Sequence, residues 1–366
     1  MRYFPAFIIL IHGCIHCMGF AKAFGYGNIT ALTKYISKAA GSFWLLAAFL
    51  FITAAILLLL KKEHWFYWAL PAAIISQALI ISEWKDAKFG TIVNILVLAA
   101  IITGFAAKHF SNRYKKDVTA YLKNSGMFHP ALLSEDDIKT LPEPVKKYIR
   151  YTQSIGQPKI KNFRVEFTGG IRKKGQQDFM PFQSDQYNFT GAATRLFFMN
   201  AKMMRLPVAG YHCYKNGQAF MDIRLLSLFR VQYQSGNEMN MAETVTFFND
   251  MCCMAPATLM DERIQWLGTK EDSVTAAFTV NNITIRATLV FGKEWQLVNF
   301  ISNDRFAQMD DGSMQRLTWS TPLKDYKEIN GYRLPGYAAA VYTYPDGDFT
   351  YGTFSLQHIM YNIQPK

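Results

Sequence analysis

The chain has 366 residues, 50% of them hydrophobic, and a formal net charge of +12 at pH 7. The charges are unevenly spread, because residues 1–107 hold only eight Lys or Arg and three Asp or Glu, whereas the remainder has the charge density of an ordinary soluble domain. Without a long basic run, this balance argues against nucleic-acid binding and fits an anionic membrane surface better.

Four apolar segments in the first 107 residues are predicted to span a membrane. The second, Ser42–Leu60, has 19 residues without a charge, a glycine or a proline, and as a helix it would extend about 28 Å. The others run from about Phe4 to Ala21, His64 to Ser82 and Phe89 to Ala107. Short connections between them favour a small antiparallel bundle. The first segment lacks the features of a cleaved signal peptide, so we expect it to be retained.

The distribution of Lys and Arg around these segments predicts their orientation. The side that holds the amino terminus and residues 108–116 carries seven of these residues, and the opposite side carries five. By the positive-inside rule, this bias predicts a multi-pass protein of the cell (inner) membrane whose soluble part lies in the cytoplasm.

The pattern changes in the last two thirds of the chain. From Lys159 onward, apolar and polar residues alternate in at least nine short segments, among them 185–200 and 219–233. Turn residues separate many of these segments, which favours an antiparallel sheet. One helix is predicted over Glu238–Phe248.

The predicted fold class is therefore α+β. It combines an N-terminal four-helix transmembrane bundle over 1–107, a basic juxtamembrane linker over 108–133 and a soluble antiparallel β-rich domain over 134–366. That domain is expected to be a curled sheet or an open barrel with a few helices.

The first apolar segment contains four side chains that invite a functional interpretation: His12, Cys14, His16 and Cys17. Because His12 and His16 are four residues apart, they share one face of a helix. They could ligate a metal or a haem, or serve membrane redox chemistry. The structural interpretation is that they form hydrogen bonds to a neighbouring helix, for example to Ser76, Gln77 or Asn94.

The composition indicates two further groups of candidate functional residues. Glu83 and Asp86 lie in a charged turn at a predicted membrane boundary, where they could bind a lipid headgroup or pair locally. Residues 199–260 are rich in methionine, which suits either an adaptable apolar ligand site or ordinary core filling. The candidate ligand-binding residues are Met203, Met204, Met221, Leu228 and Phe229.

No nucleophile elbow, P-loop, dinucleotide fingerprint or metalloprotease helix occurs in the sequence. We therefore assign no catalytic residue, metal or cofactor, and the sequence leaves open whether the protein is an enzyme.

Several motifs between about 140 and 363 resemble an uncharacterised bacterial family, a domain of unknown function. They include Leu141-Pro142 with Pro144, the run Thr246-Phe247-Phe248-Asn249-Asp250, and Gly331-Tyr332-Arg333-Leu334-Pro335. Some members of that family look like this chain upstream, with a four-helix membrane part. The end of the chain is also similar to the open β-barrels of bacterial lipoprotein carriers, and the helical part to small membrane proteins linked to quinone or thiol redox.

These observations support one main hypothesis and two alternatives. The main hypothesis is a membrane-tethered β domain that binds a lipid or another apolar ligand at the bilayer surface. The alternatives are a membrane redox or metal protein that uses the histidines and cysteines of the first helix, and an anchored interaction or sensor module.

Overall fold

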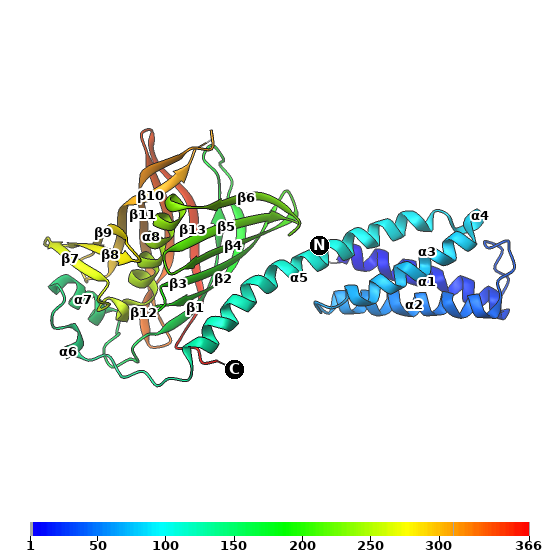
Figure 1. The fold of residues 1–366 in the computed structure, drawn as a ribbon, viewed down its shortest axis with the longest axis horizontal. Coiled ribbons are helices and arrows are strands. Elements are labelled where there is room, and N and C mark those ends of the chain that lie inside the picture. The colour runs from blue at the N-terminus through cyan, green and yellow to red at the C-terminus, as the bar shows by residue number, and fades with distance from the viewer. Residues whose placement is uncertain (1–2, 310, 366) are drawn as a thin grey trace. The chain divides into compact units, whose positions relative to one another are not determined.

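The structure, a computed structural model, describes residues 3–309 and 311–365. The chain divides into two units, Met1–Phe110 and Ser111–Lys366. The first is built of apolar helices and the second of an antiparallel sheet with a few helices, as Figure 1 shows for each unit. This confirms the predicted α+β fold class.

The helices of the first unit follow the apolar segments of the sequence. Within the described residues, α1, α2 and α5 are long and apolar enough to cross a membrane. Helix α3 is apolar but has 17 residues, which is close to the shortest length that spans a bilayer. The bounds are α1 Tyr3–Phe24, α2 Lys38–Leu59, α3 Phe66–Ser82, the single turn α4 Trp84–Ala87, and α5, which begins at Gly90 and ends at Ser125.

Helices α1 and α2 pack closely because small residues lie between them. A Cβ on Gly19 would collide with the ring of Trp44, and a Cβ on Gly41 would collide with Ala23. In a membrane, such small residues let helices approach each other and gain van der Waals contact. The two glycines therefore fix the distance between α1 and α2.

In the described residues of the second unit, thirteen strands form one antiparallel sheet. The order is β6-β5-β4-β3-β2-β1-β13-β12-β11-β10-β9-β8-β7, so the pairing of β1 with β13 joins the two halves of the chain. The strands are β1 Asn162–Ile171, β2 Met180–Phe189, β3 Thr194–Met203, β4 Leu206–Lys215, β5 Gln218–Leu225, β6 Phe229–Ser235, β7 Ile264–Thr269, β8 Ser273–Val280, β9 Ile283–Phe291, β10 Leu297–Gln308, β11 Met314–Ile329, β12 Tyr332–Tyr344 and β13 Gly347–Tyr361.

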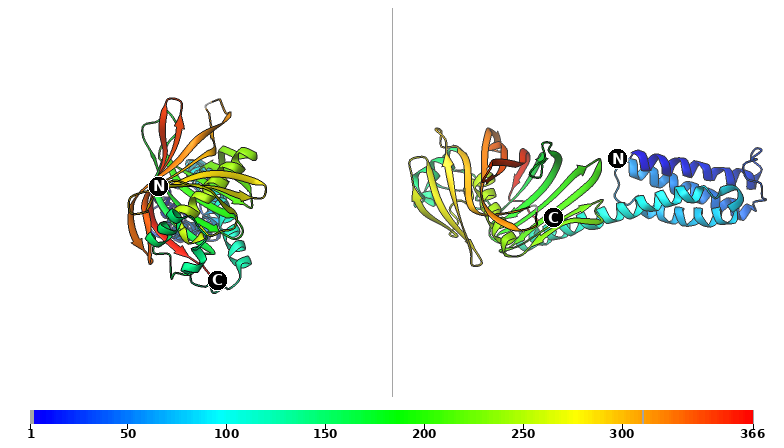
Figure 2. Two further views of the ribbon diagram at one scale, coloured as in Figure 1. Left: turned by 90° about the vertical axis from the view of Figure 1, so that its left-hand side faces the viewer. Right: turned by 90° about the horizontal axis from the view of Figure 1, so that it is seen from above.

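The sheet curls around helix α8, Asn237–Met254 (Figures 1 and 2). Most of this helix is buried, because its side chains pack into the hydrophobic core of the sheet. Phe248, for example, stacks on Phe278 of β8, with ring centroids 4.9 Å apart. We call the face of the sheet on which α8 lies the inner face. A short 3₁₀ helix, Pro256–Thr258, follows α8.

The remaining helices cover other parts of this unit. The last part of α5, from Ser111 onward, packs on the outer face, where Tyr114 stacks on Phe198 and Asp117 accepts a hydrogen bond of 2.5 Å from the hydroxyl of Tyr211. Helices α6, Glu135–Ile138, and α7, Glu143–Tyr151, precede the sheet.

Three details differ from the sequence-based prediction. The helix expected to end near Ala107 continues to Ser125. Segments 185–200 and 219–233, each expected as one strand, are divided between β2 and β3 and between β5 and β6. The second division falls at Leu226-Ser227-Leu228, where a single serine between two leucines gives only a weak turn signal.

Candidate functional site

The inner face of β2–β6 changes from polar to apolar along the strands. Paired residues of neighbouring strands point to the same face. The pair Asn188 and Arg195 lies in the row beneath α8, whereas Ala201, Val208 and Leu225 share a row near the β3–β4 and β5–β6 turns. Six apolar side chains of this face are partly or largely exposed. We call them the apolar strip: Met203, Leu206, Met221, Ile223, Leu225 and Phe229.

Helix α8 places two carboxylates over the polar row. Glu243 and Asp250 are seven residues apart, so both project from one side of the helix. Arg195 donates from Nη1 to Glu243 Oε2 at 3.1 Å and from Nε to Asp250 Oδ2 at 2.8 Å. All three side chains are buried. We call Arg195, Glu243 and Asp250 the buried ion cluster.

Amide side chains complete the hydrogen bonding of the buried ion cluster. Asp250 Oδ2 accepts from Gln186 Nε2 at 2.7 Å and from Asn188 Nδ2 at 3.1 Å. Burial raises the pKa of Asp250 above its usual value. Burial would also raise the pKa of Glu243, but the positive charges of Arg195 and Arg305 outweigh it and hold that pKa below its usual value. The cluster thus keeps Glu243 ionised inside the core.

His212 and Arg305 lie beside the buried ion cluster, because the charges of Glu243, Arg195 and Arg305 all act on the imidazole of His212. His212 pairs with Met221 of the strip, and burial lowers the pKa of its imidazole to about 4. Arg305 donates to the carbonyl of Ala242 at 3.1 Å and to the hydroxyl of Tyr342 at 3.1 Å. Both side chains are only partly buried. The inner end of the strip therefore meets the imidazole of His212, and the charge of the Arg305 guanidinium reaches that imidazole. A cation in this position suits a polar or anionic group of a ligand.

Four of the five candidate ligand residues lie at two neighbouring turns. Met203 and Met204 are at the β3–β4 turn, and Leu228 and Phe229 are at the β5–β6 turn. The amide of Leu226 donates to the carbonyl of Pro207 at 2.8 Å, which joins the two turns. Met221 lies deeper on the inner face, against the core.

The candidate residues of α1 are placed on different faces. His12 Nε2 lies 3.0 Å from Asn94 Oδ1 and 3.2 Å from Ser76 Oγ, partners that the structural interpretation expects. His16 Nδ1 lies 2.8 Å from the carbonyl of His12, and both histidines are buried. Cys14 and Cys17, in contrast, are free and exposed. The structure therefore does not bring the cysteines to the histidines.

Asp86 and Glu83 have different surroundings. Asp86 Oδ2 accepts from the amide of Thr33 at 2.6 Å and from its hydroxyl at 2.8 Å, so it holds the α1–α2 connection against the α3–α5 connection. The side chain of Glu83 is buried. In residues 3–309 and 311–365, no group of three or more His, Cys, Asp or Glu side chains is arranged to hold a metal ion.

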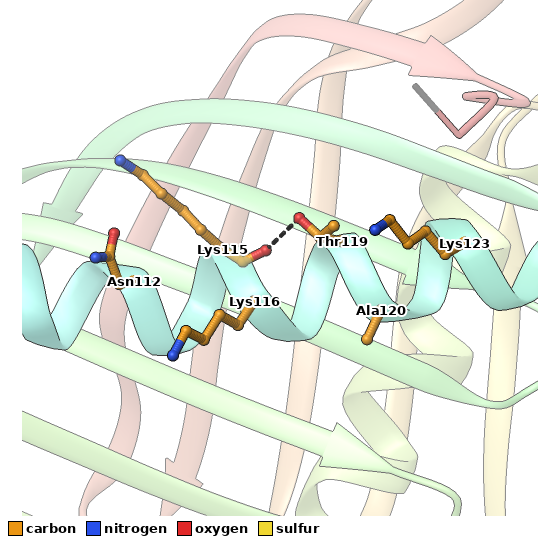
Figure 3. A pocket seen from close by; sticks show the side chains of 6 residues that line it. All are labelled: Asn112, Lys115, Lys116, Thr119, Ala120 and Lys123. Carbon is orange, nitrogen blue, oxygen red and sulfur yellow. Dashed lines mark hydrogen bonds between the residues drawn. The ribbon is translucent and has the colours of Figure 1, made fainter.

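Two hollows on the surface of the second unit are lined mainly by residues with polar or charged side chains. One, of about 370 Å³, is lined along α5 by residues that include Lys115, Lys116 and Lys123 (Figure 3). The other, of about 270 Å³, is lined by Arg164 and other residues of β1 and β13 and by Asn330 of the β11–β12 turn. Neither coincides with the apolar strip, which is an open surface.

Sequence reasoning missed the buried ion cluster and Arg305. Glu243 and Asp250 carried one usable signal, because a spacing of seven residues places both on one side of a helix, but the predicted helix ended at Phe248, whereas α8 continues to Met254. Arg195 carried none, because it is 48 residues from Glu243 and 55 from Asp250.

Comparison with known proteins leads to a family. No curated protein matches the chain. Among solved structures, the chain is similar to a LolA superfamily protein from Nitrosomonas europaea, with 8% sequence identity and a TM-score of 0.35, over 64% of this chain and 96% of that one. Residues 131–354, more than half of the chain, match a family of unknown function (DUF6544). The protein whose apolar strip and buried ion cluster are described above therefore belongs to the DUF6544 family.

Proposed function

We propose that the β-sheet unit binds an apolar chain, such as the acyl chain of a lipid, along the apolar strip. The observation that carries this proposal is the exposure of the strip itself. Six apolar side chains on one face of a sheet remain in contact with water although a core lies beside them. Burial of such surface by a ligand is favourable by about 25 cal/mol per Å², and contiguous exposed apolar surface commonly marks a binding site.

The chemistry at the inner end of the strip supports a ligand with one polar end. Arg305, a residue of intermediate exposure, offers a guanidinium that is held in place by Ala242 and Tyr342. Its guanidinium also lies 4.5 Å from the ring centroid of Trp319, which limits its motion. A carboxylate or phosphate at the end of an acyl chain would find a fixed cation there.

A membrane crossed by the apolar helices would be the source of such a ligand. Because α1, α2 and α5 are long and apolar enough to cross a membrane, the covalent chain would keep the strip within reach of lipids. We therefore propose that the protein acts at a membrane surface, in agreement with the predicted domain organisation of membrane part, linker and soluble domain.

Photo-crosslinking tests this function. The full chain is reconstituted into vesicles that contain a phospholipid with a diazirine on its acyl chain, irradiated, and digested for mass spectrometry. We expect labelled peptides from β4 and β5 in addition to the apolar helices, which serve as an internal reference.

A matched pair of variants makes the test specific. Ile223→Asp places a charge on the inner face, and Tyr233→Asp places one on the outer face of the adjacent strand, since Tyr233 pairs with Asp222. We expect Ile223→Asp to remove most β-sheet labelling and Tyr233→Asp to leave it unchanged, with thermal unfolding recorded for both. Absence of β-sheet labelling in the parent chain, or an equal response of the two variants, would contradict the proposal.

A further inference from the structure

The β3–β4 and β5–β6 turns expose an unusual amount of apolar surface. Met204 is 90% exposed and Phe229 is 62% exposed, and the two turns are joined by the hydrogen bond between Leu226 and Pro207. Neither turn has a covering element among the described residues. We call the exposed apolar residues of these turns the turn edge: Met203, Met204, Leu206, Leu228 and Phe229.

The residues of the β3–β4 turn are poorly suited to its backbone. Met204 and Arg205 both have positive φ, +49° and +69°, which is the conformation of a type I′ turn. Such turns favour Asn-Gly, and the same sheet uses this pair at Asn216-Gly217 and Asn330-Gly331. A long side chain in this conformation raises the free energy of the folded state, so local folding does not explain Met204 and Arg205.

The turn edge is surrounded by positive charge. Residues 200–235 contain a single acidic residue, Asp222, and five Lys or Arg, of which all but Lys215 lie in the half of the strands near these turns. Asp222 is buried and already bound by arginines, among them Arg224, whose Nη2 lies 2.9 Å from its Oδ2. Lys202 and Arg205 are exposed directly beside the apolar side chains. A mixture of exposed apolar and basic residues is typical of surfaces that enter the headgroup region of an anionic membrane.

The turn edge also lies toward the end of the unit at which the chain enters. Along α5, the ring of Tyr114 contacts Tyr211, Asp117 contacts both Tyr211 and Lys215, and the ring of Tyr121 lies 5.8 Å from Lys215 Nζ. As α5 proceeds, its contacts on β4 therefore move from Tyr211 to Lys215, away from the strand end at Leu206. The turn edge lies in the opposite direction, toward Ser111, where the covalent chain arrives from an apolar helix.

We propose that the turn edge docks into the headgroup region of an anionic bilayer, the one that holds the protein's own helices. Met204, Leu228 and Phe229 enter the boundary between headgroups and acyl chains, while Lys202 and Arg205 bind lipid phosphates. The composition favours a lipid surface over a protein partner, because the basic side chains match phosphate charge and the apolar ones are dispersed on two narrow turns. Met203, Leu206 and Phe229 belong to both the turn edge and the apolar strip, so docking is tested at Met204 and Leu228, which lie outside the strip.

Depth-dependent quenching tests the proposal. In the full chain, the exposed Cys14 and Cys17 are replaced by serine, so that an introduced cysteine carries the only accessible label. A nitrobenzoxadiazole dye is attached at Met204→Cys or, as a control, at Asn282→Cys. Asn282 is also an exposed turn residue with positive φ, but its turn lies beside Asn216, at the opposite end of β4. The proteins are reconstituted into phosphatidylcholine vesicles with or without phosphatidylglycerol, and brominated lipids serve as quenchers.

We expect strong quenching at position 204 in vesicles with phosphatidylglycerol, weaker quenching in phosphatidylcholine alone, and little at position 282 in either. Neutralisation by Lys202→Gln should lower the equilibrium constant for docking by roughly fivefold, which is the contribution of one basic residue at an anionic surface. Quenching at 204 that equals quenching at 282, or that is the same with and without anionic lipid, would overturn the proposal.

A second variant separates docking from folding. In Met204→Asn/Arg205→Gly, the turn receives the residues that its backbone prefers, so the fold is retained. With the dye placed at Leu228→Cys, this variant should show clearly less quenching than the parent turn. Unchanged quenching would show that the β3–β4 turn does not dock.

Discussion

Arg195 of β3 and Asp250 of α8 form a buried ion pair, with 2.8 Å between Nε and Oδ2. The same guanidinium reaches Glu243, which lies about two turns from Asp250 on the helix, so a single arginine fixes α8 at two points. Because buried charges are costly without partners, this arrangement penalises any other position of α8 on the inner face.

Removal of the arginine should therefore destabilise the protein strongly. Arg195→Met leaves Glu243 and Asp250 buried without their cation, and we expect a loss of about 3–5 kcal/mol in the free energy of unfolding. Urea unfolding of the full chain in detergent, followed by tryptophan fluorescence, measures it. As a control, Lys174→Met removes an exposed ion pair with Asp346 and should cost less than about 1 kcal/mol. Similar losses for both variants would contradict the role of the cluster.

His212 should make stability depend on pH. Its pKa is about 4 in the folded protein and 6.5 as the ordinary value, so between these pH values the unfolded chain binds a proton that the folded protein does not. The free energy of unfolding must therefore fall as the pH is lowered from 6.5 toward 4. The full shift corresponds to roughly 3 kcal/mol, and because His212 keeps some contact with solvent, we expect about 2 kcal/mol.

The variant His212→Gln isolates this contribution from the other charged groups near the imidazole, which are Glu243, Arg195 and Arg305. Because glutamine does not titrate, the free energy of unfolding of this variant should change less between pH 6.5 and 5 than that of the parent chain. Parallel pH profiles of the two proteins would rule out His212 as the source.

Asp222 should hold the last part of α5 on the sheet. Its carboxylate is buried and is bound by Arg113 of α5 at 3.2 Å and by Arg224. Burial alone would raise the pKa of Asp222, but the hydrogen bond and charge of Arg224 and the charge of Arg230 outweigh it, so the pKa lies below its usual value.

We expect Asp222→Asn to lower the free energy of unfolding by about 2 kcal/mol and to accelerate tryptic cleavage between residues 111 and 125. Limited proteolysis with mass spectrometry measures the cleavage. The exposed Asp178 provides the control, since Asp178→Asn should change neither quantity. Unchanged cleavage in the Asp222 variant would show that other contacts suffice to hold α5.

The β3–β4 turn should become more stable when it receives its preferred residues. Met204→Asn/Arg205→Gly relieves two positive φ angles, and we expect a gain of about 1–2 kcal/mol. The reciprocal exchange, Asn216→Met/Gly217→Arg, places the unsuited pair in the β4–β5 turn and should lose a similar amount. Thermal unfolding of both in the same detergent tests the pair, and a loss of stability in the first variant would contradict the turn argument.

Local patterns in the sequence determined the two classes of structure. The uncharged run Ser42–Leu60 predicts a helix because no water is available in a bilayer to satisfy backbone groups outside a helix, and α2 occupies most of it. Alternation from Lys159 onward predicts strands for the same local reason, since successive residues point to opposite faces. Ser76 and Asn94 could also be predicted as hydrogen-bond partners of His12, because they are polar residues of the neighbouring apolar helices.

Tertiary structure alone decided how these elements meet. Composition singled out Met203, Met204, Leu228 and Phe229, but only the pairing of β4 with both β3 and β5 brings them to one end of the sheet. The link from Arg195 to Asp250 spans 55 residues, and β1 pairs with β13 across most of the unit. Periodicity reports which face a residue occupies, whereas partners distant in sequence are set by the register and packing of the whole sheet.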